Sequence, residues 1–276
     1  MKYCLAVLPE IDRVLRAAKR ILIATDFDGT LCPIADAPSH VHLTPAMLEI
    51  LQYASDCERI TLSVISGRGL EDVRRRLLLD IIFAGNHGLE IAGGGLRFEH
   101  AGALEFRQPL AGACQTLGAI LHEWPSAWIE DKGLSVTLHF RKVEPRDHPG
   151  LLFSARRALG AYGSKLALRV GNKALEIRPK VQWDKGSALR YIQERAGPFD
   201  LSICVGDDRT DETMFRANTQ HLNIRVGSVN GSAAALYLSD PTEVAMLLSH
   251  IVDICNFETS IARSASAYTS VAYGAD

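Results

Sequence analysis

Two aspartates separated by a single residue form the first motif that could carry chemistry. They are Asp26 and Asp28, in the segment 26–31 of sequence Asp-Phe-Asp-Gly-Thr-Leu. One carboxylate of such a pair can attack the phosphorus of a phosphate monoester while the other protonates the leaving alkoxide. The alternative is a simple Asx turn at the end of a strand, which is common for a lone Asp-Gly pair. The pair indicates a phosphatase with Asp26 as nucleophile if further charged groups join it.

A second acidic cluster lies in the segment 206–212, of sequence Gly-Asp-Asp-Arg-Thr-Asp-Glu. So many carboxylates at one site repel each other unless a cation compensates, and hard oxygen ligands suit Mg²⁺. The alternative is that Asp211 and Glu212 are only favourable charges in the first turn of a helix. Together the two clusters predict a magnesium site.

Two further positions could hold a phosphate group. Ser66, with Gly67 and Arg68, offers a hydroxyl group, backbone N–H groups and a guanidinium group. Lys185 could neutralise both the phosphate and the nucleophile. Taken alone, each is a weak signal, because a single lysine is more often solvated.

The elements that must position these residues alternate between strand and helix. Apolar runs predict strands at 21–25, 60–65, 81–84 and 201–205, and helices are predicted at 44–54, 70–79, 185–195 and 211–217. Such alternation is typical of a parallel α/β sheet, in which the carboxyl ends of the strands meet at one edge. We therefore expect the two aspartate clusters to converge on a single cleft.

A second, smaller α/β unit interrupts this pattern. From about residue 106 the sequence predicts a helix, a strand at 127–141, a helix at 151–162 and a strand at 166–177. We expect a core of residues 1–105 and 182–276 and an inserted unit of residues 106–181. The tail from about residue 260 is small and polar, and we expect it to be disordered.

The composition indicates which kinds of partner and which cellular compartment to expect. The 30 Lys and Arg residues are balanced by 32 Asp and Glu, so no net positive field favours nucleic acid or a membrane surface. Residues 1–20 lack the unbroken apolar run of a secretory signal, and the six cysteines form no CxxC pair. We expect a cytoplasmic protein with reduced thiols and a small-molecule substrate.

In this order, the motifs around Asp26, Ser66, Lys185 and Asp207 resemble those of the haloacid dehalogenase superfamily of phosphatases. The resemblance implies a Rossmann-like core, a parallel sheet flanked by helices, with an inserted α/β cap of the type called C2. It implies that Asp26 is the nucleophile, Asp28 the general acid and base, and Ser66 and Lys185 the holders of the phosphoryl group. The implied Mg²⁺ ligands are Asp26, the Asp28 backbone carbonyl and Asp207, with Asp208 and Asp211 behind them.

Within this superfamily the chain is similar to the trehalose-6-phosphate phosphatases over nearly its whole length. The segments that carry this similarity are 66–68, 85–90, 130–135 with His139 and Arg141, 175–179 and 184–186. The similarity implies that cap residues Glu130, Lys132, Arg141 and Glu176 contact sugar hydroxyls, and that Gly67, Arg68, Asn86 and His87 line the core side.

Some of these positions have simpler interpretations. Without the resemblance, Glu130 to Lys132 would be read as a strand whose charged residues face water, and His87 as an ordinary loop residue. Trp124, Trp128 and Trp183 are expected to be packing residues. The predicted activity is magnesium-dependent hydrolysis of trehalose 6-phosphate, functionally linked to a trehalose-6-phosphate synthase. The alternatives are hydrolysis of sucrose, mannosylglycerate or glucosylglycerate phosphates, or a catalytically silent module that binds a sugar phosphate.

Overall fold

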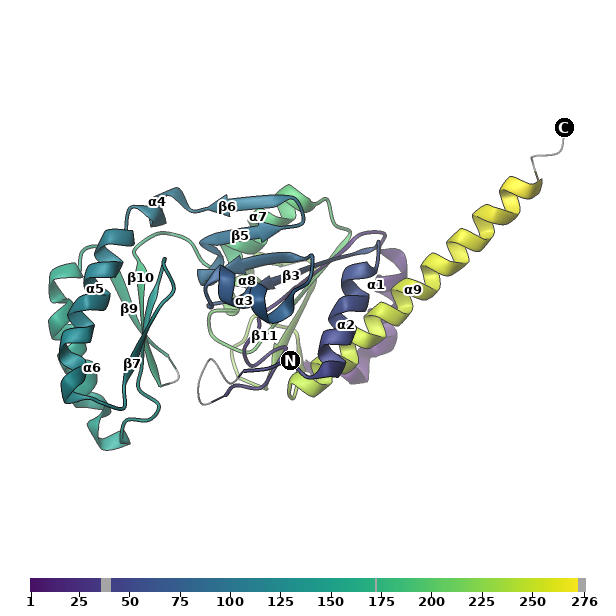
Figure 1. Cartoon of the computed structure of the whole chain (residues 1–276). Coiled ribbons are helices and arrows are strands. Elements are labelled where there is room, and N and C mark those ends of the chain that lie inside the picture. The colour runs from purple at the N-terminus through teal and green to yellow at the C-terminus, as the bar shows by residue number, and fades with distance from the viewer. Residues whose placement is uncertain (36–40, 172, 273–276) are drawn as a thin grey trace.

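A computed structural model describes the backbone of residues 1–35, 41–171 and 173–272, with side chains as far as residue 257 (Figure 1). Within these residues the strands form two separate sheets, one of nine strands and one of four. The smaller sheet and its helices lie to one side of the larger sheet. One large and one small α/β unit are thus present, as the sequence predicts.

The large sheet carries the residues that were predicted to do chemistry. Its strand order is β1 (Lys2–Tyr3), β13 (Leu236–Leu238), β12 (Leu222–Val226), β11 (Leu201–Gly206), β2 (Ile21–Thr25), β3 (Ile60–Ile65), β4 (Ile82–Gly85), β5 (Glu90–Gly93) and β6 (Leu96–Glu99). Neighbouring strands from β1 to β4 are parallel, which confirms the predicted parallel sheet. β5 and β6 add an antiparallel hairpin at one edge, which the apolar runs did not predict.

Helices cover both faces of the large sheet. α1 (Leu8–Ala17), α2 (Pro45–Asp56), α3 (Leu70–Leu77) and α9 (Pro241–Ala272) pack on one face, and α7 (Lys185–Ala196) and α8 (Glu212–Ala217) pack on the other. β2 serves both faces, because Ile21 and Ile23 point to the first and Leu22 and Ala24 to the second. This explains why β2 reads as an unbroken apolar run.

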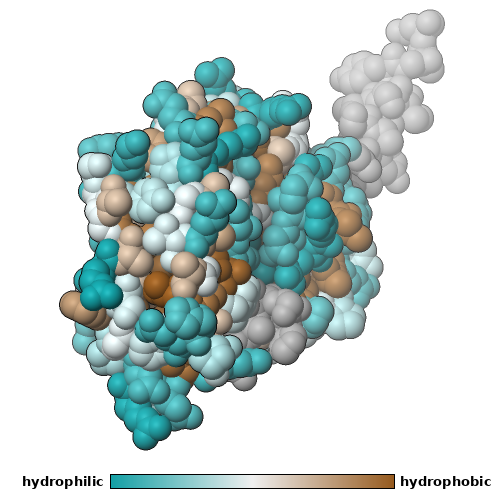
Figure 2. Space-filling view, turned by 60° about the vertical axis from the view of Figure 1, so that its left-hand side comes forward, coloured by the Kyte–Doolittle hydropathy of each residue, from teal (hydrophilic) through white to brown (hydrophobic). Residues whose placement is uncertain are grey.

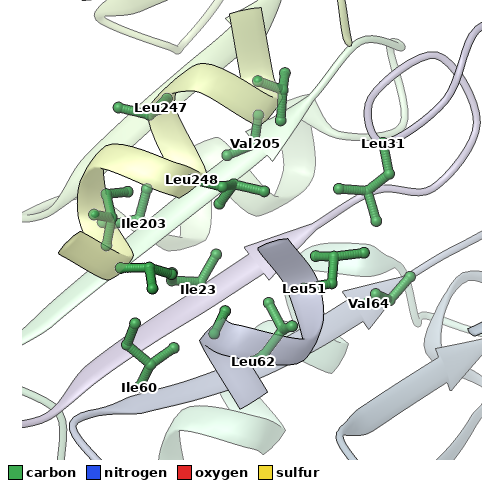
Figure 3. Packing of buried hydrophobic residues seen from close by; sticks show 14 of the residues in the cluster. Ile23, Leu31, Leu51, Ile60, Leu62, Val64, Ile203, Val205, Leu247 and Leu248 are labelled. Carbon is green, nitrogen blue, oxygen red and sulfur yellow. The ribbon is translucent and has the colours of Figure 1, made fainter. Parts of the chain in front are cut away.

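The packing around β2 and β3 fixes the sheet edge beneath the site. In Figure 3, Leu51 of α2 lies against Leu62 and Val64 of β3, and Leu248 of α9 lies near Ile203 of β11. Leu51 is fully buried. Its replacement by alanine would therefore cost about 2–5 kcal/mol.

The small unit is a four-stranded antiparallel sheet with helices on one face. Its strand order is β7 (Trp128–Asp131), β8 (Val136–His139), β10 (Ala174–Pro179) and β9 (Leu166–Gly171). α5 (Arg107–Ile120) and α6 (His148–Ala158) cover one face, where Leu117 and Leu151 join Leu138 and Leu175 in a separate core. These elements fall within residues 106–181, although the exact limits of the two domains stay a prediction.

Short segments complete the described fold. α4 (Ala101–Leu104) leads into the small unit, and turns of 3-10 helix occur at Cys4–Val7, Asn86–Gly88, Leu121–Glu123, Pro145–Asp147 and Leu159–Tyr162. None of the six cysteines, all within the described residues, forms a disulfide bond. On the face shown in Figure 2, hydrophilic residues predominate, with smaller hydrophobic areas between them.

Two predicted strands are wrong in length, because each is a hairpin. The stretch 127–141 divides into β7 and β8 around Gly133, where φ is +78°, and the stretch 166–177 divides into β9 and β10 near Lys173, where φ is +58°. Left-handed backbone at such positions ends one strand and reverses the chain. The consequence is a four-stranded sheet, whose face opposite α5 and α6 carries several charged residues.

The C-terminal segment continues the last helix of the large unit. The backbone of α9 continues through residue 260 to Ala272, and the disorder expected of this tail stays a prediction. Alanines recur along this stretch and neither glycine nor proline interrupts it, which favours helix. Figure 1 shows this end of α9 extending away from the sheet. Within the described part of the chain, no helix combines the length and apolar character needed to cross a membrane.

Candidate active site

The predicted nucleophile lies at the carboxyl edge of the large sheet. Thr25, the last residue of β2, pairs with Val205 of β11 and Val64 of β3, so Asp26 and Ser66 follow neighbouring strands. The Asp26 backbone N–H donates to the Val205 carbonyl at 2.9 Å, and the Asp26 side chain is buried. Parallel strands thus bring the first three motifs to a single edge.

Lys185 joins the two acidic clusters. Its Nζ lies 2.8 Å from Asp26 Oδ1 and 2.8 Å from Asp211 Oδ1. Lys185 is the first residue of α7, whose start is fixed by Asp184, since that carboxylate accepts a hydrogen bond from the Ser187 N–H. With 2% of its surface exposed, Lys185 belongs to a buried ion network and is not a solvated surface lysine.

Three carboxylates face this ammonium group. Oxygen atoms of Asp26, Asp207 and Asp211 all lie within 4.8 Å of one another. Gly29 makes this approach possible: its φ is +77°, and a Cβ there would lie 2.2 Å from Asp207 Oδ2. Lys185 neutralises one of the three charges. A hard divalent cation such as Mg²⁺ fits the oxygen donors and the remaining charge.

The pKa values of these groups also indicate an excess of negative charge in the cluster. Burial raises the pKa of Asp26 well above its usual value; attraction to Lys185 opposes this shift and the neighbouring carboxylates add to it. Burial and the Asp211 carboxylate raise the pKa of Asp207 to about 7. Burial works against the charge of Lys185, but Asp211 and Asp26 together raise its pKa, so the ammonium form persists. The cluster holds more negative charge than Lys185 alone balances.

The loop after β11 is held from inside the protein. Asp211 Oδ1 binds Lys185, while its Oδ2 accepts from the Asp208 N–H at 2.9 Å, so both oxygens have protein partners. The buried Arg225 donates to the carbonyls of Asp207 and Asp208. Sequence analysis missed Arg225; its one signal is a positive charge inside the otherwise mainly apolar strand β12.

The second aspartate of the first motif is paired with Arg68. Arg68 Nε lies 2.7 Å from Asp28 Oδ2 and its second terminal nitrogen 2.6 Å from Asp28 Oδ1, a bidentate arrangement. Its remaining nitrogen donates to Asp72, which also binds Arg76. The Ser66 hydroxyl oxygen accepts from the Arg68 N–H. Asp72 was not predicted, although its i+4 spacings to both arginines are a recognisable helical signal.

Residues of the small sheet reach the large unit directly. Lys132 Nζ donates to the Gly67 carbonyl at 3.1 Å, and His87 Nε2 lies 2.6 Å from Glu176 Oε1. Burial lowers the pKa of His87. Burial disfavours the charge of Glu176, but His87 and Arg178 outweigh it and lower the pKa of this carboxyl. A neutral His87 that donates its Nε2 proton to an ionised Glu176 fits both directions.

Glu130 is the centre of a second pairing on the small sheet. His139 Nε2 lies 2.8 Å from Glu130 Oε2, and Lys132 Nζ lies 3.8 Å from the same oxygen. Burial opposes the charge of Glu130, but the His139 hydrogen bond and the Lys132 ammonium lower its pKa overall. The lowered pKa keeps Glu130 ionised, so its carboxylate can accept hydrogen bonds.

Asn86 lies behind the site. It is fully buried, its amide nitrogen donates to the Lys132 carbonyl and to Glu90, and its oxygen accepts from Ser135 at 2.6 Å. Asn86 and His87 both have positive φ, at 50° and 57°. Such backbone is uncommon outside glycine and tends to occur at functional sites. Asn86 thus joins the two units and does not line the space between them.

A cavity of about 1010 Å³ lies between the two units. Most predicted site residues line it: Asp26, Asp28, Ser66, Gly67, Arg68, His87, Glu130, Lys132, Arg141, Glu176, Lys185, Asp207 and Asp208. Asp211 and Asn86 are not among the lining residues. The lining also includes residues that sequence analysis did not place at the site, among them Trp128, Thr137, His139, Arg169 and Arg178.

The three tryptophans lie in different environments. Trp124 packs on the core of the small unit, and Trp183 packs near Leu89 while its N–H donates to the Gly88 carbonyl. These two packing predictions are confirmed. The prediction for Trp128 is wrong, because it lines the cavity with 40% of its surface exposed. Its position on the edge strand β7 leaves it without a strand neighbour on one side.

Comparison with known proteins agrees with this geometry. The model of the trehalose-phosphatase family matches residues 24–241. Trehalose-phosphate phosphatase B of Arabidopsis thaliana is 31% identical over 268 residues, covering 90% of this chain and 71% of the plant protein. A protein of Mycobacterium tuberculosis described as an uncharacterised glycosyl hydrolase is 33% identical over 298 residues. That alignment takes in 99% of this chain, which spans only 21% of the mycobacterial protein.

Solved structures show the same fold. The crystal structure of a trehalose-6-phosphate phosphatase related protein has a TM-score of 0.75 and 26% identity, covering 84% of this chain and 97% of its own. The C-terminal domain of a trehalose-6-phosphate phosphatase from C. albicans also has a TM-score of 0.75, at 20% identity, with 89% and 97% coverage. A haloacid dehalogenase-like hydrolase from Bacteroides thetaiotaomicron aligns with a TM-score of 0.61. With its haloacid dehalogenase fold and a family match that spans both aspartate clusters, this chain belongs to the trehalose-phosphatase family.

Proposed function

We propose that this chain is a phosphatase that hydrolyses trehalose 6-phosphate to trehalose and phosphate. The observation that carries the proposal is the contact of Asp26 with Lys185 inside a buried acidic cluster, across a cavity from Glu130 and Glu176. The buried cluster supports phosphoryl transfer, and the family match supports the substrate.

Asp26 attacks phosphorus and becomes a transient aspartyl-phosphate. Lys185, held in its charged form, stabilises the negative charge on the phosphoryl oxygens as the sugar oxygen departs. The Ser66 hydroxyl lines the cavity beside it and donates a hydrogen bond to the same group. The burial of Asp26 and Lys185 makes these charges more effective than they would be in water.

Asp28 moves the protons. It protonates the sugar oxygen in the first step and, as a carboxylate, takes a proton from the water that releases phosphate in the second. The two hydrogen bonds from Arg68 suit the ionised carboxylate of the second step. The first step requires Asp28 to leave this pair and carry a proton.

Magnesium completes the charge balance. Asp26, the Asp28 backbone carbonyl and Asp207 would hold the ion, and Asp208 and Asp211 would support it from behind. The supporting role suits Asp211, because both of its oxygens already bind protein groups. Bound Mg²⁺ would supply positive charge that offsets repulsion between the carboxylates and the phosphate oxygens.

The small sheet acts as a cap that recognises the sugar. Glu130, Lys132, Arg141 and Glu176 bond the sugar hydroxyls from the cap side, and Gly67, Arg68 and His87 complete the core side. The contacts of Lys132 with Gly67 and of Glu176 with His87 couple cap closure to the assembly of the site.

Phosphate release from trehalose 6-phosphate, sucrose 6-phosphate and glucose 6-phosphate, each with Mg²⁺ and with EDTA, tests the proposal. We expect magnesium-dependent release that favours the trehalose ester. Preference for another ester would agree with the proposed phosphatase mechanism but reject trehalose 6-phosphate as the substrate. If no phosphate is released from any of the three esters, a module that only binds sugar phosphates would be favoured. The cytoplasmic location and the functional link to a trehalose-6-phosphate synthase stay predictions.

A further inference from the structure

The cavity-facing side of the small sheet is built from two cross-strand rows. Strand register places Glu130, Thr137, Glu176 and Arg169 in the first row, and Trp128, His139, Ala174 and Gly171 in the second. All eight residues line the cavity. The first row is strongly polar. The second combines two aromatic rings with two of the smallest residues, so the rows offer different chemistry to a ligand.

The aromatic pair forms a flat platform. The rings of Trp128 and His139 are stacked, with centroids 4.1 Å apart and an interplanar angle of 12°. Because β7 is an edge strand, His139 covers one side of Trp128 and no strand covers the other, in agreement with the 40% exposure of the tryptophan. The exposed face of Trp128 is apolar surface left in contact with water. A ligand that stacks on this face would bury it.

The platform is held in place by the first row. The Glu130 carboxylate binds His139 Nε2 at 2.8 Å, which fixes the imidazole against which Trp128 stacks. Ala174 and Gly171 continue the second row with little side chain, leaving space above the sheet. Arg141 and Arg169 also line the cavity. The result is a stacked aromatic pair whose open Trp128 face points to the edge of the sheet, with polar groups of the first row beside it and free space over Ala174 on the His139 side.

A pyranose ring has matching chemistry. Its faces present C–H groups that carry slight positive charge, which suits the negative face of an aromatic ring, while its hydroxyl groups point outward to charged partners. The phosphate-binding cluster at the other end of the same cavity already points to a sugar phosphate as the ligand. A hexose ring is therefore the ligand that this end of the cavity fits.

The position of the platform distinguishes the two rings of a disaccharide. From the residue after β7 back along the strand, the cavity-facing order is Lys132, Glu130 and Trp128, and Lys132 contacts the large unit through Gly67. Successive residues on one face of a strand lie roughly 6.6 Å apart. Trp128 thus lies one step farther from the phosphate-binding edge than Glu130. A sugar that bears its phosphate at Asp26 meets the first row, and a second ring attached to it meets the second row.

We propose that Trp128 and His139 form a subsite for the hexose ring that does not carry the phosphate, with Trp128 as a determinant of selectivity for disaccharide esters. This inference rests on the proposed function and extends it, because it assigns the non-phosphorylated half of the substrate to a surface centred on Trp128, which the sequence motifs did not include.

The kinetic test compares trehalose 6-phosphate with glucose 6-phosphate, which lacks the second ring. In Trp128→Ala, the ratio of kcat/KM for the disaccharide ester to that for the monosaccharide ester falls roughly ten-fold, the size of a lost aromatic contact. Trp128→Phe retains most of the ratio. Phe153→Ala removes a more exposed aromatic residue from α6, outside the cavity, and leaves the ratio unchanged. An unchanged ratio in Trp128→Ala would overturn the proposal.

A binding measurement separates failure of the subsite from failure of the proposed function. Trehalose alone is titrated into the protein while tryptophan fluorescence is recorded, in wild type and in Trp128→Phe. A change in wild type that is lost in the variant supports the subsite, even if trehalose 6-phosphate is not hydrolysed. A fluorescence change that is equal in both proteins, or absent from both, rejects the subsite even if hydrolysis occurs.

Discussion

The two walls of the cavity are built in different ways. On the large-sheet side, Lys185 is 2% exposed and lies in contact with Asp26 and Asp211, so the charges are buried and already paired. On the small-sheet side, Trp128 is 40% exposed and Glu130 keeps part of its surface open. The first wall is organised before a ligand arrives, whereas the second offers groups that a ligand would cover. We infer that one wall performs the chemistry and the other selects the substrate.

The walls remain connected through a few hydrogen bonds. Lys132 reaches the Gly67 carbonyl, and Ser135 and Asn86 bond at 2.6 Å. These contacts leave open space between the walls for a ligand of disaccharide size. Substitutions on each wall should therefore have separable effects.

The largest effect is expected at the nucleophile. Asp26→Asn should lower the rate of phosphate release by about a thousand-fold or more, because a neutral amide cannot form the aspartyl-phosphate. The rate is measured with trehalose 6-phosphate at saturating Mg²⁺. Asp80→Asn, which changes an exposed aspartate, is the matched control and should keep full activity. Turnover by Asp26→Asn at the wild-type rate would refute Asp26 as nucleophile.

The next effect concerns the stability of the first wall. Lys185→Met leaves Asp26 and Asp211 buried without their shared cation, so the free energy of unfolding in EDTA should fall by about 3–5 kcal/mol. Urea denaturation measures this change. Lys19→Met, at an exposed position, should unfold at the wild-type midpoint. Equal midpoints for the Lys185 and Lys19 variants would mean that the buried ion network does not stabilise the protein.

A smaller effect is expected on the second wall. Glu176→Gln keeps the shape of the side chain but removes the charge that pairs with His87 and Arg178. Loss of charge-assisted hydrogen bonds should lower kcat/KM for trehalose 6-phosphate by about ten- to a hundred-fold. Glu144→Gln changes an exposed glutamate of the same unit and should have no effect. If both glutamine variants behave alike, Glu176 has no role in selection.

The smallest expected effect is a pH dependence of the free energy of unfolding, caused by His87 where the two walls meet. Burial lowers the pKa of His87 below the usual histidine value of 6.5, so below that pH the unfolded chain binds a proton that the folded chain does not. The contribution of His87 to the free energy of unfolding should therefore decrease as pH falls from 7.5 to 5, whereas the raised pKa of Asp207 contributes in the opposite direction. His87→Gln should flatten this slope in urea denaturation. The exposed His42→Gln serves as control and should retain it; a steeper slope in His87→Gln would contradict the assignment.

Sequence predicted the first wall better than the second. Asp26 and Asp207 follow apolar runs, and parallel strands bring such positions together at one edge without further information. The second wall depends on hairpins whose turns, at Gly133 and Lys173, were not recognised, so neighbouring rows could not be predicted. Nothing local in the sequence distinguishes Trp128 from Trp124 and Trp183, which do pack in the cores. One side of Trp128 is open because β7 is an edge strand, and this position follows from the sheet topology and not from the local sequence.

Arg225 illustrates a different limit. Its contacts with the Asp207 and Asp208 carbonyls join residues from separate elements, and no local spacing in the sequence indicates them. A buried arginine in a mainly apolar strand suggests a partner but does not identify it.

The most direct test of the division between the walls is one specificity ratio. It is kcat/KM for trehalose 6-phosphate divided by kcat/KM for p-nitrophenyl phosphate, measured with Mg²⁺ in wild type, Ser66→Ala and Glu176→Gln. We expect Ser66→Ala to lower both rates together and keep the ratio, and Glu176→Gln to lower the ratio by about ten-fold or more. A ratio that falls equally in both variants would contradict the separation of chemistry from selection.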